Sequence, residues 1–428
     1  MKAVLEHFKT ISAIPRCSFE ASAMKEFIVT FAQKCGCLTQ VDEAGNVLCV
    51  KGTPRVCLQA HYDMVCIGET KTIELIQEGM LLKAKNSTLG ADNGMGMALM
   101  FWVMETYENV ECLFTADEEV GLIGASQFTL PLKSRYVLNL DSETEGEICI
   151  GCAGGVDVIA TLALHKTPVP KGAQFYEVVA EGFLGGHSGI DIDKHIPSAL
   201  KVLARELSKT SCVLVHFEGG DRRNAIPKSA KAIVASYEPL EFSDNHLHVK
   251  RLEEGSYKEV LLESKRLLNL LNGFAQGVRA WDTALNIPLS SINMGLVRMD
   301  EKSVRFDCAA RSMDDENLAI LADETQAFFE ALGCDVAQEH WHGAWKPDAG
   351  IFAQKLKAIM QTQYPEVSMY AVHAGLECGE LIARQAQKIE AASIGPTIHY
   401  PHSLREECDL ESVARMRVIL EKIMNEVD

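Results

Sequence analysis

Residues 110–121 read VECLFTADEEVG, a short apolar run that ends at two adjacent glutamates, Glu118 and Glu119. A short apolar run followed by polar residues is typical of a buried strand. Two charged residues after such a strand usually belong to a solvated loop, because charged side chains lie mostly in water. The rest of the sequence decides between that interpretation and a functional site.

Three further segments before residue 155 resemble this strand, and a long apolar stretch, residues 94–107, predicts a buried helix between the second and the third of the four strands. Strands that alternate with helices predict a largely parallel sheet of the α/β class. The four strand candidates are residues 46–52, 55–61, 110–116 and 136–141.

The pattern changes after residue 155. Strand-like segments at 156–165, 173–182, 230–239 and 303–312 alternate with helical ones at 196–207 and 259–274, and helices dominate again at 352–364 and 410–424. A chain of 428 residues exceeds one hydrophobic core. We therefore expect an α/β domain, with a mixed, largely parallel sheet flanked by helices, built from residues 1–155 and 345–428. An α+β domain of residues 156–344 is inserted between them.

The composition excludes several partners. With 59 acidic and 41 basic residues the net charge is −18, which disfavours nucleic acid and anionic membranes as partners. No apolar run reaches the roughly 18 residues of a membrane span. The first 17 residues show helical spacing rather than a signal peptide's apolar core. We expect a cytoplasmic protein.

The fourteen cysteines are scattered, mostly within apolar runs. This distribution favours reduced cysteines in the core over disulfides. Cys149 and Cys152 form a CIGC motif without a second pair or nearby histidines, so neither metal nor redox use is expected of them.

Polar residues follow the predicted strands at one edge of the sheet. His61 ends one strand, Asp141 ends another, and Asp92 opens the apolar helix. Ligands of open α/β sheets lie at this edge. Because strand residues two apart share a face, Asp63 can orient the His61 ring. Taken singly, His61 also suits a buried structural role, and Asp92 a helix cap.

Two histidines near the other terminus, His399 and His402, complete a candidate metal site. Histidines together with carboxylates suit zinc or a similar divalent ion. Two ions bridged by one carboxylate need about five ligands. The sequence offers His61, Asp92, Asp141, one of Glu118 and Glu119, and one of the two histidines. The remaining glutamate is then free to act as a base on a metal-activated water.

These motifs resemble a known family. HYD (61–63), GADNG (90–94), TADEEVGLIGA (115–125), NLDSE (139–143) and PHS (401–403) are similar to the ordered motifs of the co-catalytic zinc exopeptidases, which include glutamate carboxypeptidase, aminoacylase and carnosinase. LGGHSGIDI (184–192), GGDRRNAIP (219–227), CAARS (308–312) and VHAGLECG (372–379) resemble the aminoacyl-histidine dipeptidases within it. The resemblance covers about residues 5 to 425.

The resemblance implies a role for each residue at the metal site. Asp92 would bridge two metal ions, with a cis peptide to Asn93. His61 and Asp141 would complete one metal site, and Glu119 and His402 the other. Glu118 would be the general base and Asp63 would orient His61. His402 is preferred to His399 because Ser403 follows it and Glu406 lies four residues on, as in the family pattern.

Within the inserted domain, the resemblance implies His187 as the donor that stabilises the oxyanion. Asn224 and Arg311 would hold the substrate, and the guanidinium fork of Arg311 suits a terminal carboxylate. Taken alone, GGHSG is more often a turn, and Arg311 can equally form a surface ion pair. His373 and Glu377 lie in the segment that resembles the pocket-closing loop, where Glu377 is expected to bind the substrate's α-ammonium.

The implied function is zinc-dependent hydrolysis of dipeptides, of the Xaa-His type, with cobalt or manganese as alternative ions. The inserted domain would act as a lid, and a homodimer formed through it is expected. The alternatives are an acyl-amino-acid hydrolase or tripeptidase with the same metal site, and a metal-dependent binding protein without turnover. Four further histidines, His246, His248, His340 and His342, fit no motif and are expected to be structural or exposed.

Overall fold

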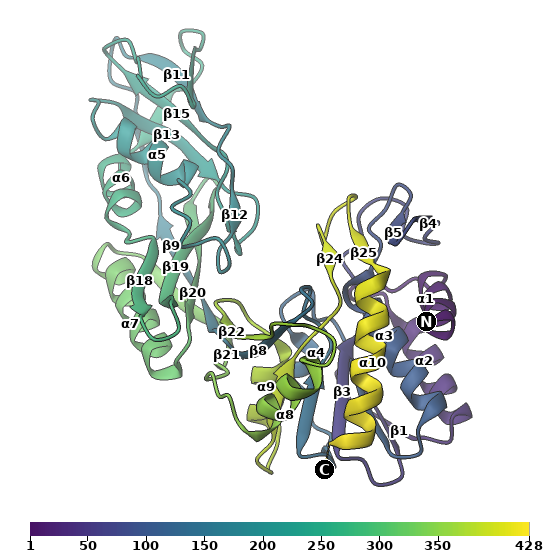
Figure 1. Ribbon diagram of the computed structural model, residues 1–428. Coiled ribbons are helices and arrows are strands. Elements are labelled where there is room, and N and C mark those ends of the chain that lie inside the picture. Colours follow the sequence, from purple (N-terminus) through teal and green to yellow (C-terminus); the bar gives the residue numbers. More distant parts are fainter. Residues whose placement is uncertain (428) are drawn as a thin grey trace. The chain divides into compact units, whose positions relative to one another are not determined.

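The computed structural model describes residues 1–427 and divides them into two compact units (Figure 1). Unit 1 comprises Met1–Cys152, Trp345–Ala371 and the chain from Gly375 onward. Unit 2 comprises Ala153–Ala344 and the short piece Val372–Ala374. The two units together give the mixed α/β fold with helix-flanked sheets that the sequence predicts.

Unit 1 is built on an eight-stranded sheet in the order β1-β2-β6-β3-β7-β23-β8-β22. The pairs β3–β6, β3–β7 and β7–β23 are parallel, so the carboxyl ends of these strands meet at one edge. The strands are β1 (Leu38–Val41), β2 (Val47–Lys51), β3 (Val56–His61), β6 (Val110–Thr115), β7 (Tyr136–Asn139), β8 (Glu147–Cys152), β22 (Ser368–Val372) and β23 (Glu390–Ser393).

The strand β2 corrects one expectation, because it runs antiparallel to β6 rather than parallel to the central strands. It also pairs antiparallel with β1 across a tight turn, in which the Asn46 backbone N–H donates to the Asp42 carboxylate at 2.9 Å. A connection this short can only join antiparallel strands. An antiparallel edge on an otherwise parallel sheet is common.

Alternation along β3 separates the core from the site. Val56, Leu58 and Ala60 belong to the main apolar core, which is also lined by helices from both ends of the chain, whereas Gln59 and His61 point to the other face. The helices of unit 1 are α1 (Lys2–Ser12), α2 (Ser22–Lys34), α3 (Ala91–Thr106), α4 (Ile123–Ser126), α8 (Ile351–Met360), α9 (Glu377–Arg384) and α10 (Leu410–Glu426).

A small antiparallel sheet adds to unit 1, in the order β24-β25-β5-β4, and joins segments from both ends of the sequence. It positions the loop that carries His402. Its strands are β4 (Leu75–Glu78), β5 (Leu81–Ala84), β24 (Ile398–His399) and β25 (Glu407–Asp409).

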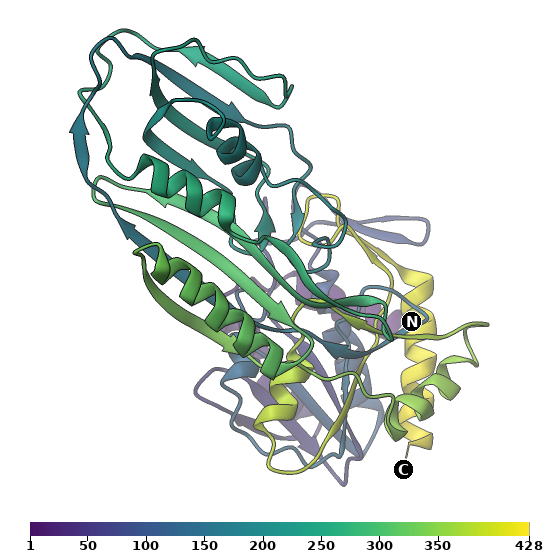
Figure 2. The same ribbon diagram turned by 90° about the vertical axis from the view of Figure 1, so that its left-hand side faces the viewer.

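Unit 2 holds an antiparallel sheet in the order β16-β11-β15-β13-β19-β20-β9-β21, with β18 paired to β19. Helices α5 (Ala199–Leu207), α6 (Ser264–Gly273) and α7 (Asp315–Ala331) bury their apolar residues against one face of it (Figure 2). The strands are β9 (Gly154–Ala163), β11 (Gln174–Ala180), β13 (Val213–Gly219), β15 (Ala230–Ser236), β16 (Leu247–Arg251), β18 (Gly277–Asp282), β19 (Ile287–Met299), β20 (Ser303–Ser312) and β21 (Asp335–His342). Two short pairs complete unit 2, β10 (Lys166–Pro168) with β17 (Glu259–Leu261) and β12 (Gly186–His187) with β14 (Ala225–Ile226).

The expectation that the cysteines are all reduced is wrong for one pair. Cys17 and Cys66 form a disulfide, with their Cα atoms 5.6 Å apart. The segment around Cys17 pairs with Met64, which brings together two cysteines 49 residues apart in sequence. Among residues 1–427 the other twelve cysteines form no disulfide, and ten of them are buried.

None of the helices described between residues 1 and 427 is both long and apolar enough to cross a bilayer.

Candidate metal and peptide site

The carboxylate of Asp92 lies between two histidines in unit 1. Its Oδ1 is 3.0 Å from His61 Nε2, and its Oδ2 is 3.0 Å from His402 Nε2. Asp141 Oδ1 lies 3.2 Å from His61 Nε2, and Glu119 Oε2 lies 3.0 Å from His402 Nε2. The five predicted ligands therefore form two sets of three that share Asp92.

The local backbone explains how Asp92 reaches this position. Gly90 has a φ of 66°, in the left-handed region that glycine adopts readily, and the peptide from Asp92 to Asn93 is cis, as the resemblance implied. The backbone N–H groups of Leu89, Gly90 and Ala91 donate to the Glu406 carboxylate at 2.8, 3.0 and 2.8 Å. Glu406 thus fixes the turn that precedes Asp92.

The His61 ring has a defined orientation. Its Nδ1 donates to the backbone oxygen of Asp63 at 3.1 Å and lies 3.5 Å from the Asp63 carboxylate. The Nε2 atom then faces the carboxylates of Asp92 and Asp141. This arrangement is typical of metal-binding histidines, whose second nitrogen is held by an oxygen atom.

The charges in this cluster favour the binding of a cation. Burial opposes the charged form of His61, but the Asp141 carboxylate outweighs it and raises the pKa of His61. At His402, which is more exposed, Asp92 and Glu119 likewise outweigh partial burial and raise the pKa to about 11. Without a metal ion, the carboxylates of each set therefore stabilise a proton on the histidine. A metal ion in the same place would take over the role of that proton. Glu119 Oε1 is buried and, among the described residues, has no hydrogen-bond partner, which also fits a cation.

The donor set agrees with this preference. Imidazole nitrogens and carboxylate oxygens suit zinc, cobalt and manganese better than calcium or magnesium, which favour oxygen alone. The residues present therefore fit two divalent ions of this group, with Asp92 between them.

Glu118 lies beside the two sets that share Asp92 rather than in either of them. Its Oε2 is 4.0 Å from His61 Nε2. Burial raises the pKa of Glu118 well above its usual range, and the negative charge of Glu119 raises it further. The Asp63 carboxylate accepts the backbone N–H groups of Glu118 and Glu119 at 3.0 and 3.3 Å. Asp63 therefore orients both the histidine and the glutamate pair.

Glu377 lies at the first residue of α9 and is fully buried in unit 1. Its Oε2 accepts hydrogen bonds from Thr115 Oγ1, at 2.9 Å, and from Gln59 Nε2. Burial raises its pKa to about 7, and its Oε1 has no partner among the described residues. A buried oxygen of this kind can receive a cationic group.

Two glutamates and an arginine near the metal cluster were not assigned roles from the sequence. Burial and the charge of Asp92 raise the pKa of Glu143 to about 8. Glu406 holds the Asp92 turn, and Arg16 is buried beside it. Glu143 belongs to the NLDSE motif and Glu406 to the pattern after His402, so the sequence motifs could have identified both residues. No motif contains Arg16. His399 is exposed and belongs neither to the two sets that share Asp92 nor to the third possible ligand group among residues 1–427, which is His61, Glu118 and Glu119.

The other predicted residues form a group within unit 2. His187 is on β12, which pairs with β14, and next to this pair the Ser188 N–H donates to the Asn224 carbonyl at 2.8 Å. A Cβ atom on Gly189 would collide with the His373 carbonyl oxygen, and it would lie 3.2 Å from the His187 ring and 3.3 Å from Arg311 Nε. Glycine at position 189 therefore lets the three residues gather.

The His187 tautomer follows from its contacts. The backbone N–H groups of Gly189 and Ile190 each donate to His187 Nδ1 at 3.2 Å. A nitrogen that accepts two hydrogen bonds cannot also carry the proton of the neutral ring. The proton is therefore on Nε2, which makes Nε2 a donor.

Arg311 also acts on two further histidines of unit 2. Burial, and then the charge of Arg311, lowers the pKa of His373 and that of His342 to about 4. His373 Nε2 lies 2.7 Å from Ser291 Oγ. His342, expected to be structural or exposed, is half-buried against Gly155. Both rings are neutral at ordinary pH.

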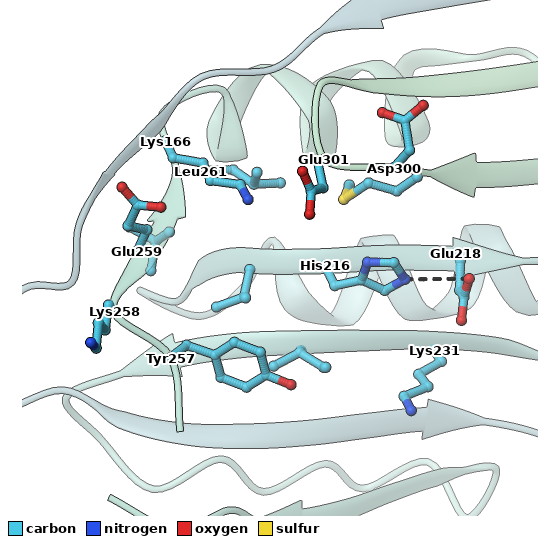
Figure 3. Close-up of a pocket in the computed structure, with 14 residues that line it drawn as sticks. Lys166, His216, Glu218, Lys231, Tyr257, Lys258, Glu259, Leu261, Asp300 and Glu301 are labelled. Atoms are coloured by element: carbon cyan, nitrogen blue, oxygen red, sulfur yellow. Dashed lines mark ion pairs between the residues drawn. The ribbon is translucent and has the colours of Figure 1, made fainter. Parts of the chain in front are cut away.

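A pocket of about 520 Å³ lies elsewhere in unit 2 and is lined by residues of mixed charge (Figure 3). His216 lies 3.3 Å from Glu218 within it, and Lys166 and Tyr257 belong to its wall. Its described lining contains none of the predicted site residues. The pocket is therefore separate from the His187 and Arg311 group.

Comparisons with known proteins identify the family. A model of peptidase family M28 matches residues 47–153. The chain is 32% identical to the cytosol non-specific dipeptidase of Escherichia coli, over 98% of this chain and 96% of that protein. It is 30% identical to the aminoacylhistidine dipeptidase of Vibrio alginolyticus, whose crystal structure matches 98% of this chain and is covered to 96%, with a TM-score of 0.78.

A tripeptidase from Staphylococcus aureus shares the fold at 14% identity, with a TM-score of 0.61 over 99% of this chain and 97% of the other. At that identity the likeness concerns the fold alone. The two dipeptidases match nearly the whole chain at 30% identity or more. The chain therefore belongs to the metallopeptidase family that contains these dipeptidases.

Proposed function

We propose that this protein is a dipeptidase that uses two metal ions, with Xaa-His dipeptides among its substrates. The observation that carries the proposal is the position of Asp92, whose two oxygens each face a different histidine at 3.0 Å. The names of the two dipeptidases similar to this chain support the substrate class.

The two ions are proposed to be zinc, with cobalt and manganese as alternatives. His61, Asp92 and Asp141 would hold one ion, and Asp92, Glu119 and His402 the other. When bound, two such ions polarise a peptide carbonyl and lower the pKa of a shared water towards neutrality. The remaining steps depend on the side chains of this chain.

Glu118 is proposed as the general base. Its carboxylate lies beside both ligand sets that share Asp92 and is not needed in either of them. It would take the proton of the attacking water and deliver it to the amine that leaves when the peptide bond breaks. Asp63 supports this step, because it holds the Glu118 backbone and the His61 ring together.

The residues of unit 2 are proposed to bind the peptide. The Nε2–H of His187 would donate to the oxyanion that develops on the scissile carbonyl. Arg311 would pair with the terminal carboxylate of the peptide, and Asn224 and His373 would contact the peptide beside it. The histidines beside Arg311 are neutral, so they can donate to an anion while the guanidinium supplies the positive charge, which supports this assignment.

Glu377 of unit 1 is proposed to receive the α-ammonium of the dipeptide. Its buried Oε1 has no partner among the described residues, and a cation would restore its charged form. A free α-ammonium is the group that distinguishes a dipeptide from an acylated amino acid. This assignment therefore favours a dipeptidase over an acyl-amino-acid hydrolase.

Unit 2 is further proposed to act as a lid and to form a homodimer, and the protein to be cytoplasmic. The family resemblance supports the first two, and the cytosolic relative supports the third. Light scattering coupled to size-exclusion chromatography tests the dimer, for which twice the chain mass of 47.0 kDa is expected.

The function is tested by hydrolysis of Gly-His, β-Ala-His and Ala-Leu, with N-acetyl-His beside them. The protein is assayed after chelation and again after zinc, cobalt or manganese is restored. We expect metal-restored cleavage of free dipeptides and none of the acetylated compound. Cleavage of N-acetyl-His alone would show an acyl-amino-acid hydrolase. Binding of two metals without any cleavage would show a binding protein.

A further inference from the structure

Arg16 is an arginine buried in unit 1, with 2% of its surface exposed. Within residues 1–427 no other lysine or arginine is buried to this degree. Burying a guanidinium is unfavourable unless hydrogen bonds and opposite charges compensate it. Its contacts therefore indicate what it is for.

The Arg16 guanidinium joins two separate turns. Its Nη1 donates to the backbone oxygens of Asp63, at 2.7 Å, and Tyr62, at 3.2 Å, while its Nη2 donates to the backbone oxygen of Gly90. The first turn follows His61, and the second precedes Asp92. One planar group thus sets the distance between the segments that carry two of the proposed metal ligands.

The surroundings are shaped for this guanidinium. A Cβ atom at Gly90 would lie 2.6 Å from Arg16 Nη2, and one at Gly94 would lie 2.7 Å from it. Both distances are too short for a side chain. Glycine at these two positions therefore leaves the space that the guanidinium occupies.

The neighbours of Arg16 hold the same turns. Ser18 Oγ donates to Asp63 Oδ2 at 2.7 Å, and the Arg16 carbonyl accepts the Met64 N–H at 3.0 Å. On the other side, Glu406 accepts the Gly90 N–H while Arg16 donates to the Gly90 carbonyl. The Gly90 peptide groups are therefore fixed from both sides.

The positive charge of Arg16 lies among several carboxylates. The carboxylates that act on it most strongly are those of Glu406, Asp63, Asp92 and Glu119, in that order. Before any metal binds, these acids repel one another, and Arg16 is the buried permanent cation among them. It compensates part of that repulsion.

We propose that Arg16 is a positioning residue of the metal centre, which fixes the spacing of the His61 and Asp92 segments so that both ions can bind. The inference rests on the proposed ligand set. The hydrogen bonds of the Arg16 guanidinium go to backbone oxygens of the two turns and not to the proposed ligand atoms, so its effect must pass through these turns.

The sign of the change in metal affinity tests this role. If Arg16 acted only through its charge, replacing it with a neutral residue would strengthen the binding of a cation. If it positions the ligands, the same change weakens binding by about 10–100-fold, as loss of a supporting contact does. Arg16→Met removes the charge, and Arg16→Lys keeps it without the planar fork that reaches both turns.

Zinc affinity is measured by competition with a chelator, and the visible spectrum of the cobalt-loaded protein reports ligand geometry. We expect both variants to bind zinc about 10–100-fold more weakly, with an altered cobalt spectrum. The matched controls are Arg405→Met and Arg405→Lys, which change an exposed arginine three residues from His402. These controls are expected to bind zinc as the unchanged protein does.

Unchanged or stronger zinc binding in both Arg16 variants would overturn the proposal. Far-UV circular dichroism after chelation establishes that each variant is folded, and if Arg16→Met fails to fold, Arg16→Lys alone decides. His402→Ala separates this inference from the proposed function. If His402→Ala binds both metals with unchanged affinity, the ligand set is wrong whatever Arg16 does.

Discussion

The two units enclose opposite kinds of titratable group. Unit 1 gathers carboxylates around Asp92, whereas unit 2 gathers His187, His342 and His373 around Arg311. Burial disfavours the charged form in both units, so it raises the pKa of glutamates in the first and lowers that of histidines in the second. The first group has an excess of negative charge, which favours cations, and the second group has a guanidinium and neutral donors, which favour an anion.

The histidines of unit 1 show what decides whether the pKa of a histidine rises or falls. His61 is buried and His402 is half-exposed, yet the pKa rises at both because two or more carboxylates face each ring. In unit 2 the charge that acts on His342 and His373 is that of Arg311, which adds to the effect of burial. The same residue type thus has a raised pKa beside carboxylates in one unit and a lowered pKa beside an arginine in the other.

The largest expected effect comes from Glu118→Gln. If the carboxylate is the base, kcat falls by about 10²–10⁴-fold while two metal ions stay bound. Stopped assays with Gly-His and metal analysis of the same sample measure both. Glu43→Gln, at an exposed glutamate of unit 1, serves as the control. Turnover close to that of the control would refute the role of Glu118.

In unit 2 the next largest effect is expected from His187→Phe. Loss of the Nε2–H donor is predicted to lower kcat by about 10²–10³-fold, with a smaller change in KM, because the oxyanion exists only in the transition state. Steady-state kinetics measure the two constants. The control, His248→Phe, changes an exposed histidine of the same unit. A rise in KM with kcat unchanged would instead make His187 a ground-state binding residue.

Arg311→Lys sharpens the comparison between charge and shape. The positive charge stays, but the paired N–H donors are lost, so KM for free dipeptides is expected to rise by about 10–100-fold, the equivalent of about 1.5–3 kcal/mol. Steady-state kinetics with Gly-His measure it, and Arg279→Lys, at an exposed arginine, is the control. An unchanged KM would show that Arg311 does not hold the terminal carboxylate.

The smallest effect concerns the pH dependence of stability in the metal-free protein. Glu377 has a pKa of about 7 when folded and an ordinary value of 4.5. The folded state therefore keeps its proton while the unfolded chain loses one, and stability falls as pH rises from about 4.5 to 7, by about 1 kcal/mol per pH unit.

Glu377→Gln removes this contribution, so its stability should fall less than that of the unchanged protein over the same range. Urea unfolding after chelation, at pH 5 and pH 7, measures the difference. The exposed Glu366→Gln serves as the control. Equal slopes with pH in both proteins would show that Glu377 is charged at pH 7.

Local sequence patterns predicted helices and strands well where a single segment contains all the information needed. The runs that end at His61 and Thr115, and the one that contains Leu138, form the parallel strands β3, β6 and β7, because short apolar runs between helices have few other structures open to them. The antiparallel pairing of β2 with β1 is set by a turn of only a few residues. The motif residues expected at the strand ends do come together around Asp92.

The features that local patterns missed depend on contacts between distant segments. The Cys17–Cys66 disulfide needs the pairing of Cys17 with Met64, which no spacing rule contains. Arg16 lies 74 residues from Gly90 in the sequence and, without a partner in view, resembles any surface arginine. His342 fitted no motif for the same reason, since its environment depends on its pairing with Gly155 on β9.

Unit 1 is built from segments at both ends of the chain. This arrangement determines when the site can assemble during synthesis. Asp92 and the histidine it meets, His402, are 310 residues apart in the chain. A ribosome that adds roughly 5–20 residues per second needs about 15–60 s to travel from one to the other. For that interval the nascent chain carries His61 and Asp92 without their last partner. The growing protein therefore holds an incomplete, acidic cluster of the proposed metal ligands until the segment around His402 has been made.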